Sequence, residues 1–320
     1  MMSKTRNRGP GADGRSLDMK RTSLLAPALA VRTLGLVFAG GILLCGASLE
    51  PATKAIHLLQ VGAGRYLAAD GVSLNGKGSH RFLIDTGSNS SVFDVNAARD
   101  LRVGPTYYTR VEFLGGVATV PAARVTLCIG NICKENSEVL LTKLPAVKLA
   151  DSRVRGILGM DFLTRSGFVL DSRHMELTIG RARLDYGGTM VPLERVFGRL
   201  AVRAKLTKNS DSMNLVLDSG APCLVLFGPH RGSANAGHAR RMALMTNFGI
   251  ARAASVEEKL DLRLGSYVVR KLPAVVLPSE PTNDPDRGDG LIPTSVFEAV
   301  VFHRSGAYAL IDKAEKLRHP

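Results

Sequence analysis

The stretch FLIDTGS, residues 82–88, is a short apolar run that ends in Asp85-Thr86-Gly87. A second copy of this pattern, LVLDSGA, occupies residues 215–221 and contains Asp218-Ser219-Gly220. Asp218 follows Asp85 by 133 residues, which is about the length of one domain. A single Asp-Thr/Ser-Gly triplet is common by chance, but two copies that each close a hydrophobic run indicate a duplicated unit.

Paired carboxylates explain why these residue types recur. Two carboxylates about 3 Å apart cannot both ionise, so they hold one proton between them. The ionised member can take a proton from water while the neutral one polarises a carbonyl group, which hydrolyses an amide without a metal. Glycine after the acid permits a sharp turn, and the Thr or Ser hydroxyl can hydrogen-bond to the opposite loop. We predict Asp85 and Asp218 as catalytic, with the loop residues Thr86, Gly87, Ser88, Ser219 and Gly220 supporting them.

A hydrophobic run that begins at a glycine is the second element that the two halves share. In the first half it is Gly156-Ile157-Leu158-Gly159, which begins 71 residues after Asp85. In the second half Gly290-Leu291-Ile292-Pro293 begins 72 residues after Asp218. Together with the two triplets, these runs resemble the pepsin/retropepsin superfamily of aspartic proteases, and its small bacterial two-lobed members most of all. The resemblance covers nearly all of residues 60–312, and it departs at Pro293, where the motif has a glycine.

This resemblance implies an all-β acid-protease fold. Two homologous β-barrel lobes would be related by a pseudo-twofold axis, with a few short helices and one catalytic Asp from each lobe in the cleft between them. The implied function is an endopeptidase that acts on a peptide or protein substrate, without a cofactor, as a monomer with both lobes in one chain. The alternative is a catalytically silent relative that binds extended peptides or a partner protein in the same cleft.

Further stretches recur in the same order in both halves. They pair residues 64–68 with 198–202, 125–130 with 260–265, 144–147 with 272–275, and 168–179 with 300–311. A turn-rich stretch at 185–188 separates the halves, so we expect an N-terminal lobe at 48–186 and a C-terminal lobe at 187–320. Short helices are expected at 161–166 and 295–299, and a third at 234–245, where good helix formers gather.

A flap, meaning a hairpin that closes over the cleft, is expected about thirty residues after each catalytic Asp. Candidate flap sequences are FLGGV at residues 113–117 and NFGI at residues 247–250. Such a lid would exclude water and hold a peptide backbone, although an ordinary hairpin turn would have the same sequence. The substrate-binding residues predicted here are Gly115, Gly116, Phe248 and Gly249.

Two cysteines, Cys128 and Cys133, flank Ile129-Gly130-Asn131-Ile132. The central Gly-Asn favours a two-residue hairpin turn, which would place the thiols directly opposite each other on paired strands. A disulfide is then expected in an oxidising compartment; the alternative is a pair of small buried hydrophobes. The Cys and His residues show no metal-ligand spacing, so no metal site is predicted.

Residues 1–47 have the features of a targeting segment. A basic stretch precedes an apolar run at 34–45, and small residues offer a cleavage site after Ala47. Met19 is a second candidate start, and Arg32 interrupts any longer apolar span. We expect this segment to engage the membrane or the export machinery. The protein would then be exported to the periplasm or another extracytoplasmic space, or held at the inner membrane if the segment is an uncleaved signal-anchor.

The chain is basic, with a formal net charge of +14 and 45% hydrophobic residues. A positive charge can indicate a nucleic-acid partner. Here the Lys and Arg residues are scattered among acidic ones, Trp is absent, and no basic-aromatic alternation occurs. The sequence therefore predicts a generally basic surface and no nucleic-acid partner.

Overall fold

In this computed structural model the described residues are 55–62, 66–113, 116–180, 188–196, 198–206, 211–228, 240–245, 251–277, 288–303 and 306–311. The predicted targeting segment and residues 185–187 of the predicted boundary lie outside these residues. Within the described ranges, no helix is long and apolar enough to cross a bilayer.

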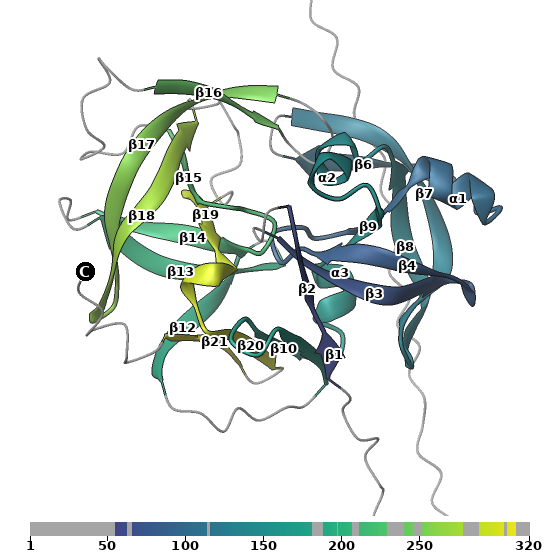
Figure 1. The fold of residues 1–320 in the computed structure, drawn as a ribbon, viewed down its shortest axis with the longest axis horizontal. Helices are drawn as coiled ribbons and strands as arrows, with labels where there is room; N and C mark the ends of the chain where they lie inside the picture. Colours follow the sequence, from purple (N-terminus) through teal and green to yellow (C-terminus); the bar gives the residue numbers. More distant parts are fainter. Residues whose placement is uncertain are drawn as a thin grey trace, which may run out of the picture. The chain divides into compact units, whose positions relative to one another are not determined.

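Strands dominate both halves of the chain (Figure 1). The first half contains β1 Ile56–His57, β2 Leu59–Val61, β3 Tyr66–Leu74, β4 Lys77–Ile84, β5 Ser91–Asp94, β6 Tyr107–Phe113, β7 Gly116–Ile129, β8 Ile132–Thr142, β9 Val154–Leu158, β10 Phe168–Asp171 and β11 Glu176–Ile179, with helices α1 Val95–Asp100, α2 Pro145–Ala150 and α3 Met160–Leu163. The second half contains β12 Thr189–Val196, β13 Arg199–Leu206, β14 Ser212–Asp218, β15 Leu224–Phe227, β16 Arg240–Met245, β17 Ala251–Leu264, β18 Tyr267–Leu277, β19 Gly290–Pro293, β20 Ala299–His303 and β21 Gly306–Ile311, with the 3-10 turn η1 Thr294–Val296.

The two sheets repeat one pairing pattern, which confirms the predicted all-β, duplicated fold. In the 8-stranded sheet, ordered β2-β3-β4-β9-β5-β8-β7-β6, strand β9 lies between the strands before and after the first Asp triplet. In the 13-stranded sheet β19 lies in the same way between β14 and β15. Each pattern curls back on itself, because β3 also pairs with β7 and β13 with β17.

Close approach of neighbouring atoms explains the glycine in the middle of β9 and the glycine that opens β19. A Cβ on Gly156 would lie 2.3 Å from the Phe82 ring and 2.6 Å from the Val92 oxygen. A Cβ on Gly290 would lie 2.2 Å from the Val225 oxygen. Real Cβ atoms essentially never come this close, so both positions require glycine.

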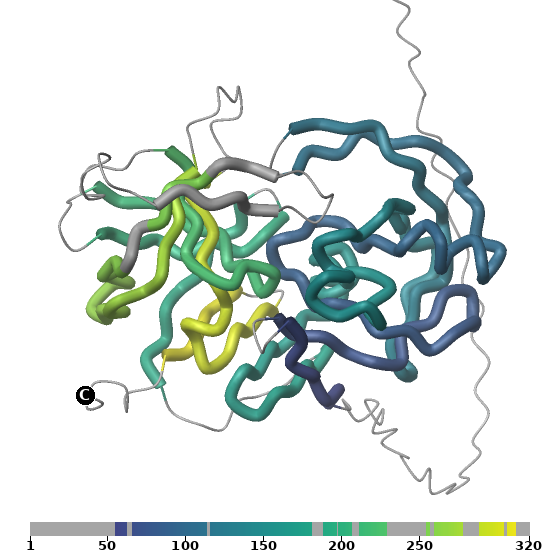
Figure 2. The backbone as a smooth tube through the Cα atoms, turned by 45° about the horizontal axis from the view of Figure 1, so that its top comes forward, coloured from purple at the N-terminus to yellow at the C-terminus, as the bar shows by residue number. Residues whose placement is uncertain are grey.

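The two halves also share a sheet directly. Strand β10 of the first half pairs antiparallel with β20 of the second, with Phe168 opposite Phe302. These two rings stack at a centroid distance of 5.9 Å. Figure 2 traces β10 and β11 alongside β20 and β21, and β1 extends this sheet by pairing with β11. The first half therefore contributes three strands to the larger sheet.

One sequence repeat is not a structural repeat. Residues 144–147 lead into α2, where Pro145 fits the first helical turn because its missing N–H has no partner there anyway. Residues 272–275, which have the same letters, lie within β18. The position equivalent to Ala274 is Val139, since they pair with Leu224 and Ser91 respectively. The predicted match of 144–147 to 272–275 is wrong.

The helix predictions are partly wrong. Arg240–Met245, expected to end a helix at 234–245, forms strand β16 and pairs with β17, so tertiary pairing overrides helix propensity; residues 234–239 lie outside the described ranges. The expected helix at 295–299 is only the turn η1, and the one at 161–166 is α3. Helix α1 was missed, although Asp94 caps it by accepting the N–H groups of Asn96 and Ala97.

The cysteine hairpin has the expected register. Cys128 pairs with Cys133 across β7 and β8, and a disulfide joins them with a Cα–Cα distance of 4.1 Å. Gly130, in the turn, has φ of 56°, a left-handed conformation that glycine adopts without strain. The bond closes the end of the hairpin that carries Lys134.

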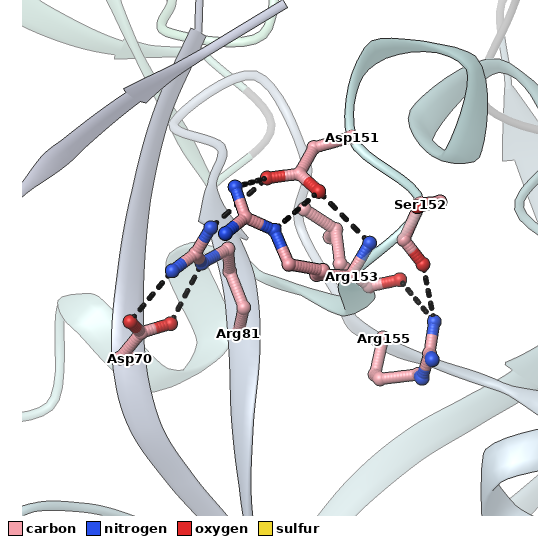
Figure 3. Close-up of polar contacts among 7 residues, drawn as sticks. Asp70, Arg81, Asp151, Ser152, Arg153 and Arg155 are labelled. Atoms are coloured by element: carbon pink, nitrogen blue, oxygen red, sulfur yellow. Dashed lines mark hydrogen bonds and ion pairs between the residues drawn. The ribbon is translucent and has the colours of Figure 1, made fainter.

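Arg81 anchors the middle of β4, the strand that leads to Asp85 (Figure 3). Its guanidinium donates to both carboxylate oxygens of Asp70, at 2.7 and 2.8 Å, and to Asp151 at 3.0 Å. Asp151 also accepts from Arg153. Hydrogen bonds from Arg81 lower the pKa of Asp70, and those from Arg153 and then Arg81 lower the pKa of Asp151. The cluster therefore ties β3, β4 and the start of β9 together.

We predict that Arg81→Met lowers the free energy of unfolding by about 2–3 kcal/mol at neutral pH, because it leaves the mostly buried Asp151 with one cation fewer. Depressed carboxyl pKa values stabilise the fold above the ordinary carboxyl range, and this contribution disappears as the pH falls. The difference from wild type should thus narrow in acid, as measured by urea unfolding. Arg155→Met, which removes a donor to the Ser152 oxygen, is the control and should cost less than about 1 kcal/mol. Equal losses in both variants would contradict this account.

Candidate active site

The first Asp triplet forms a tight loop after β4. Gly87 and Ser88 both donate their N–H groups to Oδ1 of Asp85, at 2.9 and 3.0 Å. The Asp85 N–H donates in turn to the oxygen of Leu158, at the end of β9. Asp85 is 4% exposed, so these bonds compensate for the loss of water around its carboxylate.

The second triplet forms an equivalent loop at the end of β14. Gly220 donates its N–H to Oδ1 of Asp218 at 2.7 Å, and the Ala221 N–H donates to the Asp218 backbone oxygen. Strand β19 runs parallel beside β14 and pairs Asp218 with Pro293. Both aspartates thus lie at the end of a buried strand, as predicted.

The two carboxyl groups meet over the triplet glycines. A Cβ on Gly87 would lie 2.4 Å from Cγ of Asp218, and one on Gly220 would lie 3.1 Å from Cγ of Asp85. A hydrogen bond connects the Asp85 and Asp218 side chains. Only glycine leaves room for each carboxyl group to lie on the opposite loop. The geometry therefore brings together two acids that can share one proton.

Electrostatic interactions raise the pKa of Asp218 and so favour different protonation states for the two acids. Burial, and then the negative charge of Asp85, raise the pKa of Asp218 well above its ordinary value. The Gly220 N–H and the positive charge of Arg199 act in the opposite direction. Because Asp85 accepts two backbone N–H bonds at Oδ1 and Asp218 accepts one, the arrangement favours a proton on Asp218 and a charge on Asp85.

Four hydrogen bonds clasp the two loops together. The Thr86 hydroxyl donates to the Leu217 oxygen at 2.9 Å and accepts the Ser219 N–H at 3.1 Å. Reciprocally, the Ser219 hydroxyl donates to the Ile84 oxygen at 2.6 Å and accepts the Thr86 N–H at 3.0 Å. Thr86 is 0% exposed and Ser219 is 4% exposed, so water does not compete for these groups. We call this set of four bonds the clasp.

Comparison with known proteins agrees with this geometry. A sequence model of the aspartyl protease family matches residues 71–162, which include the Asp85 triplet and the 156–159 run. Over this matched region the chain is similar to the pepsin/retropepsin superfamily of aspartic proteases. A comparison with curated protein sequences gives no match. Among solved structures, an aspartic proteinase from Irpex lacteus aligns over 82% of this chain and 98% of its own, at 11% identity and a TM-score of 0.49.

The two halves depart from strict twofold symmetry beneath the two Asp loops. In the first half Gly159 donates its N–H to the hydroxyl of Ser91 at 3.2 Å. Leu224 and Pro293 occupy the equivalent register positions in the second half, where neither a hydroxyl nor an N–H exists. In the second half Pro293 replaces the motif's glycine, which would donate an N–H. Leu224 replaces the serine whose hydroxyl would accept that N–H.

Ser88 follows the first Asp triplet and contacts its loop through two different groups. Its hydroxyl donates to the backbone oxygen of Ser90 at 2.8 Å, and its backbone N–H is the group that binds Asp85. Ser88 therefore supports Asp85 through its backbone N–H and not through its hydroxyl. In the second loop the equivalent Ala221 N–H donates to the backbone oxygen of Asp218 at 3.3 Å.

The first flap candidate lies at the end of the β6–β7 hairpin, where Gly116 has φ of 143°. Gly115 lies outside the described residues, as do Phe248 and Gly249 between β16 and β17. Partly buried side chains of the β6–β7 hairpin, among them Val111 and Ala118, pack against a buried hydrophobic cluster that contains Leu83. This hairpin is thus connected to the strand of Asp85.

Three participants escaped the sequence prediction: Arg199, Ser91 and Asp161. Arg199 opens β13, and its neighbour Gly198 lies close to Asn89 of the other half. Ser91 and Asp161 are described below. Among the described residues no group of His, Cys, Asp and Glu could hold a metal ion.

We predict that Thr86→Val lowers the free energy of unfolding by about 2–4 kcal/mol, because it leaves a buried N–H and a buried oxygen without partners. Thr86→Ser keeps the hydroxyl and is the matched control, with a smaller loss. Urea unfolding measures both. Equal stability of the two variants would show that the clasp hydroxyl does not hold the loops.

Proposed function

We propose that the protein is an aspartic endopeptidase that hydrolyses peptide bonds with water activated by Asp85 and Asp218. The observation that carries this proposal is the pair of carboxyl groups linked by a hydrogen bond and set on loops that are clasped by Thr86 and Ser219. A binding protein would have no need of a buried acid whose pKa is raised by a second acid.

The two acids would divide the work of the reaction. Asp85, charged and held by two N–H groups, would take a proton from water as that water attacks the peptide carbonyl carbon. Asp218, which retains its proton, would donate a hydrogen bond to the carbonyl oxygen as it becomes negative. Transfer of a proton to the leaving amine would complete the cleavage and restore the shared proton.

The remainder of the proposal concerns substrate and location. An extended peptide or protein segment would lie between the loops and the β6–β7 hairpin, and both acids would come from one chain, which would act as a monomer. The basic and apolar residues of 1–47 and the disulfide at Cys128 support export to an oxidising compartment. Neither a cofactor nor a nucleic acid has a role in this proposal.

We expect full-length wild type to cleave a mixed peptide library, and Asp85→Asn and Asp218→Asn each to lose cleavage by at least about 1,000-fold, because neither can share the proton. Ser88→Ala is the control and should retain activity, since its hydroxyl binds the Ser90 oxygen. Mass spectrometry of the products measures cleavage, and circular dichroism checks folding. A folded wild type that binds peptides but cleaves none would favour the silent peptide-binding relative.

The pH dependence should be set by the raised pKa of Asp218. Activity needs a protonated Asp218, so kcat/KM should fall as the pH rises through this pKa, above the ordinary carboxyl range. Arg199→Gln removes a positive charge that lowers this pKa, so the alkaline limb should move to higher pH. Arg203→Gln, on the same strand with its side chain 66% exposed, should leave the limb in place. A shift to lower pH in Arg199→Gln would contradict the assignment.

A further inference from the structure

A short chain of hydrogen bonds runs beneath the Asp85 loop. Ser91 is 0% exposed, and its hydroxyl accepts the Gly159 N–H at 3.2 Å. The same hydroxyl donates to Oδ1 of Asp161 at 2.8 Å. A hydroxyl has one proton, so the carboxylate of Asp161 fixes the direction in which Ser91 points. The chain therefore depends on an acceptor at Asp161.

The start of α3 holds the loop at two further points. The Met160 N–H donates to the Ser88 oxygen at 2.8 Å, and the Asp161 N–H donates to the Asn89 oxygen at 3.2 Å. Ser88 is also the residue whose N–H binds Asp85. A displacement of Asp161 would thus move the backbone that holds the catalytic carboxylate.

Lys134 completes the surroundings of Asp161. Its ammonium group donates to the Asp161 backbone oxygen at 2.7 Å and lies 3.8 Å from Oδ2. Burial raises the pKa of Asp161, while Ser91 and Lys134 lower it. The side chain of Asp161 thus has one neutral donor and one cation at fixed positions.

The second half cannot form this chain. Leu224, Pro293 and Ser295 occupy the positions equivalent to Ser91, Gly159 and Asp161. Leucine has no hydroxyl, and proline has no N–H. The loop of Asp218 therefore lacks the support that Asp161 gives to the loop of Asp85.

We propose that Asp161 is a positioning residue for Asp85, acting through Ser91 and the backbone of residues 88–89. It touches neither the reacting carboxyl groups nor the peptide in our account. Its effect is to hold the loop so that the Gly87 and Ser88 N–H groups stay on Asp85. The effect on turnover rests on the proposed protease function, but the effect on the loop does not.

Hydrogen exchange measured by mass spectrometry on the full-length protein tests the loop directly. Asp161→Ala and Ser91→Ala should each raise exchange in residues 85–91 by about tenfold and change residues 218–224 far less. Asp161→Asn keeps an acceptor for Ser91 and should stay within about twofold of wild type. Ser295→Ala, at the equivalent position of the other half, is the control and should change neither loop. A rise of equal size in both loops, or in neither, would overturn the proposal.

Turnover supplies the second measurement. Asp161→Ala should lower kcat about tenfold with KM unchanged, since small displacements of a catalytic group reduce the rate, and Asp161→Asn should restore most of it. An unchanged kcat in Asp161→Ala, or a loss that Asp161→Asn shares, would contradict the positioning role. If wild type cleaves no peptide, the protease proposal fails, and the exchange pattern still decides the role of Asp161. Should Asp161→Ala not fold, Ser91→Ala provides the same comparison.

Discussion

The structure depends on the clasp, the reciprocal hydrogen bonds between Thr86 and Ser219. Two acids would not remain side by side in a protein interior unless their loops were held from behind, because burial and like charge both oppose ionisation. The clasp supplies that restraint with groups that are almost fully buried. The triplet glycines then let each carboxyl group approach the opposite loop. The clasp and these glycines together thus set how closely the two acids approach each other.

Asymmetry is the second theme of the site. Duplication gave both halves the same strand order, yet the loops differ in how they are supported from below. Asp85 accepts two N–H groups and lies above the Ser91–Asp161 chain, whereas Asp218 accepts one N–H and lies beside Pro293. Unequal environments give the shared proton a preferred carboxyl group, a preference that identical environments would not provide. The different supports therefore suit an acid and a base made from the same residue type.

The elements whose residue types are required by local chemistry could be predicted from the sequence. The two triplets and the runs that begin at Gly156 and Gly290 were recognisable because each residue type is required there by a backbone approach or a hydrogen bond. Prediction failed where partners distant in sequence decide the outcome. Arg240–Met245 is a strand because it pairs with β17. The identical sequences at 144–147 and 272–275 were wrongly matched. Strand register, and not identity over four residues, decides which positions of the two halves are structurally equivalent.

Carboxyl titration by carbon NMR, with labelled aspartate in the full-length protein, tests the central claim most directly. The account predicts that the Asp218 carboxyl titrates well above the ordinary carboxyl range and that Thr86→Val, by loosening the clasp, moves its pKa back towards that range. Asp85→Asn should lower it as well, because the neighbouring negative charge is removed. If Asp218 titrates at an ordinary pKa in wild type, or is unaffected by Asp85→Asn, the two acids do not share a proton and the account is wrong.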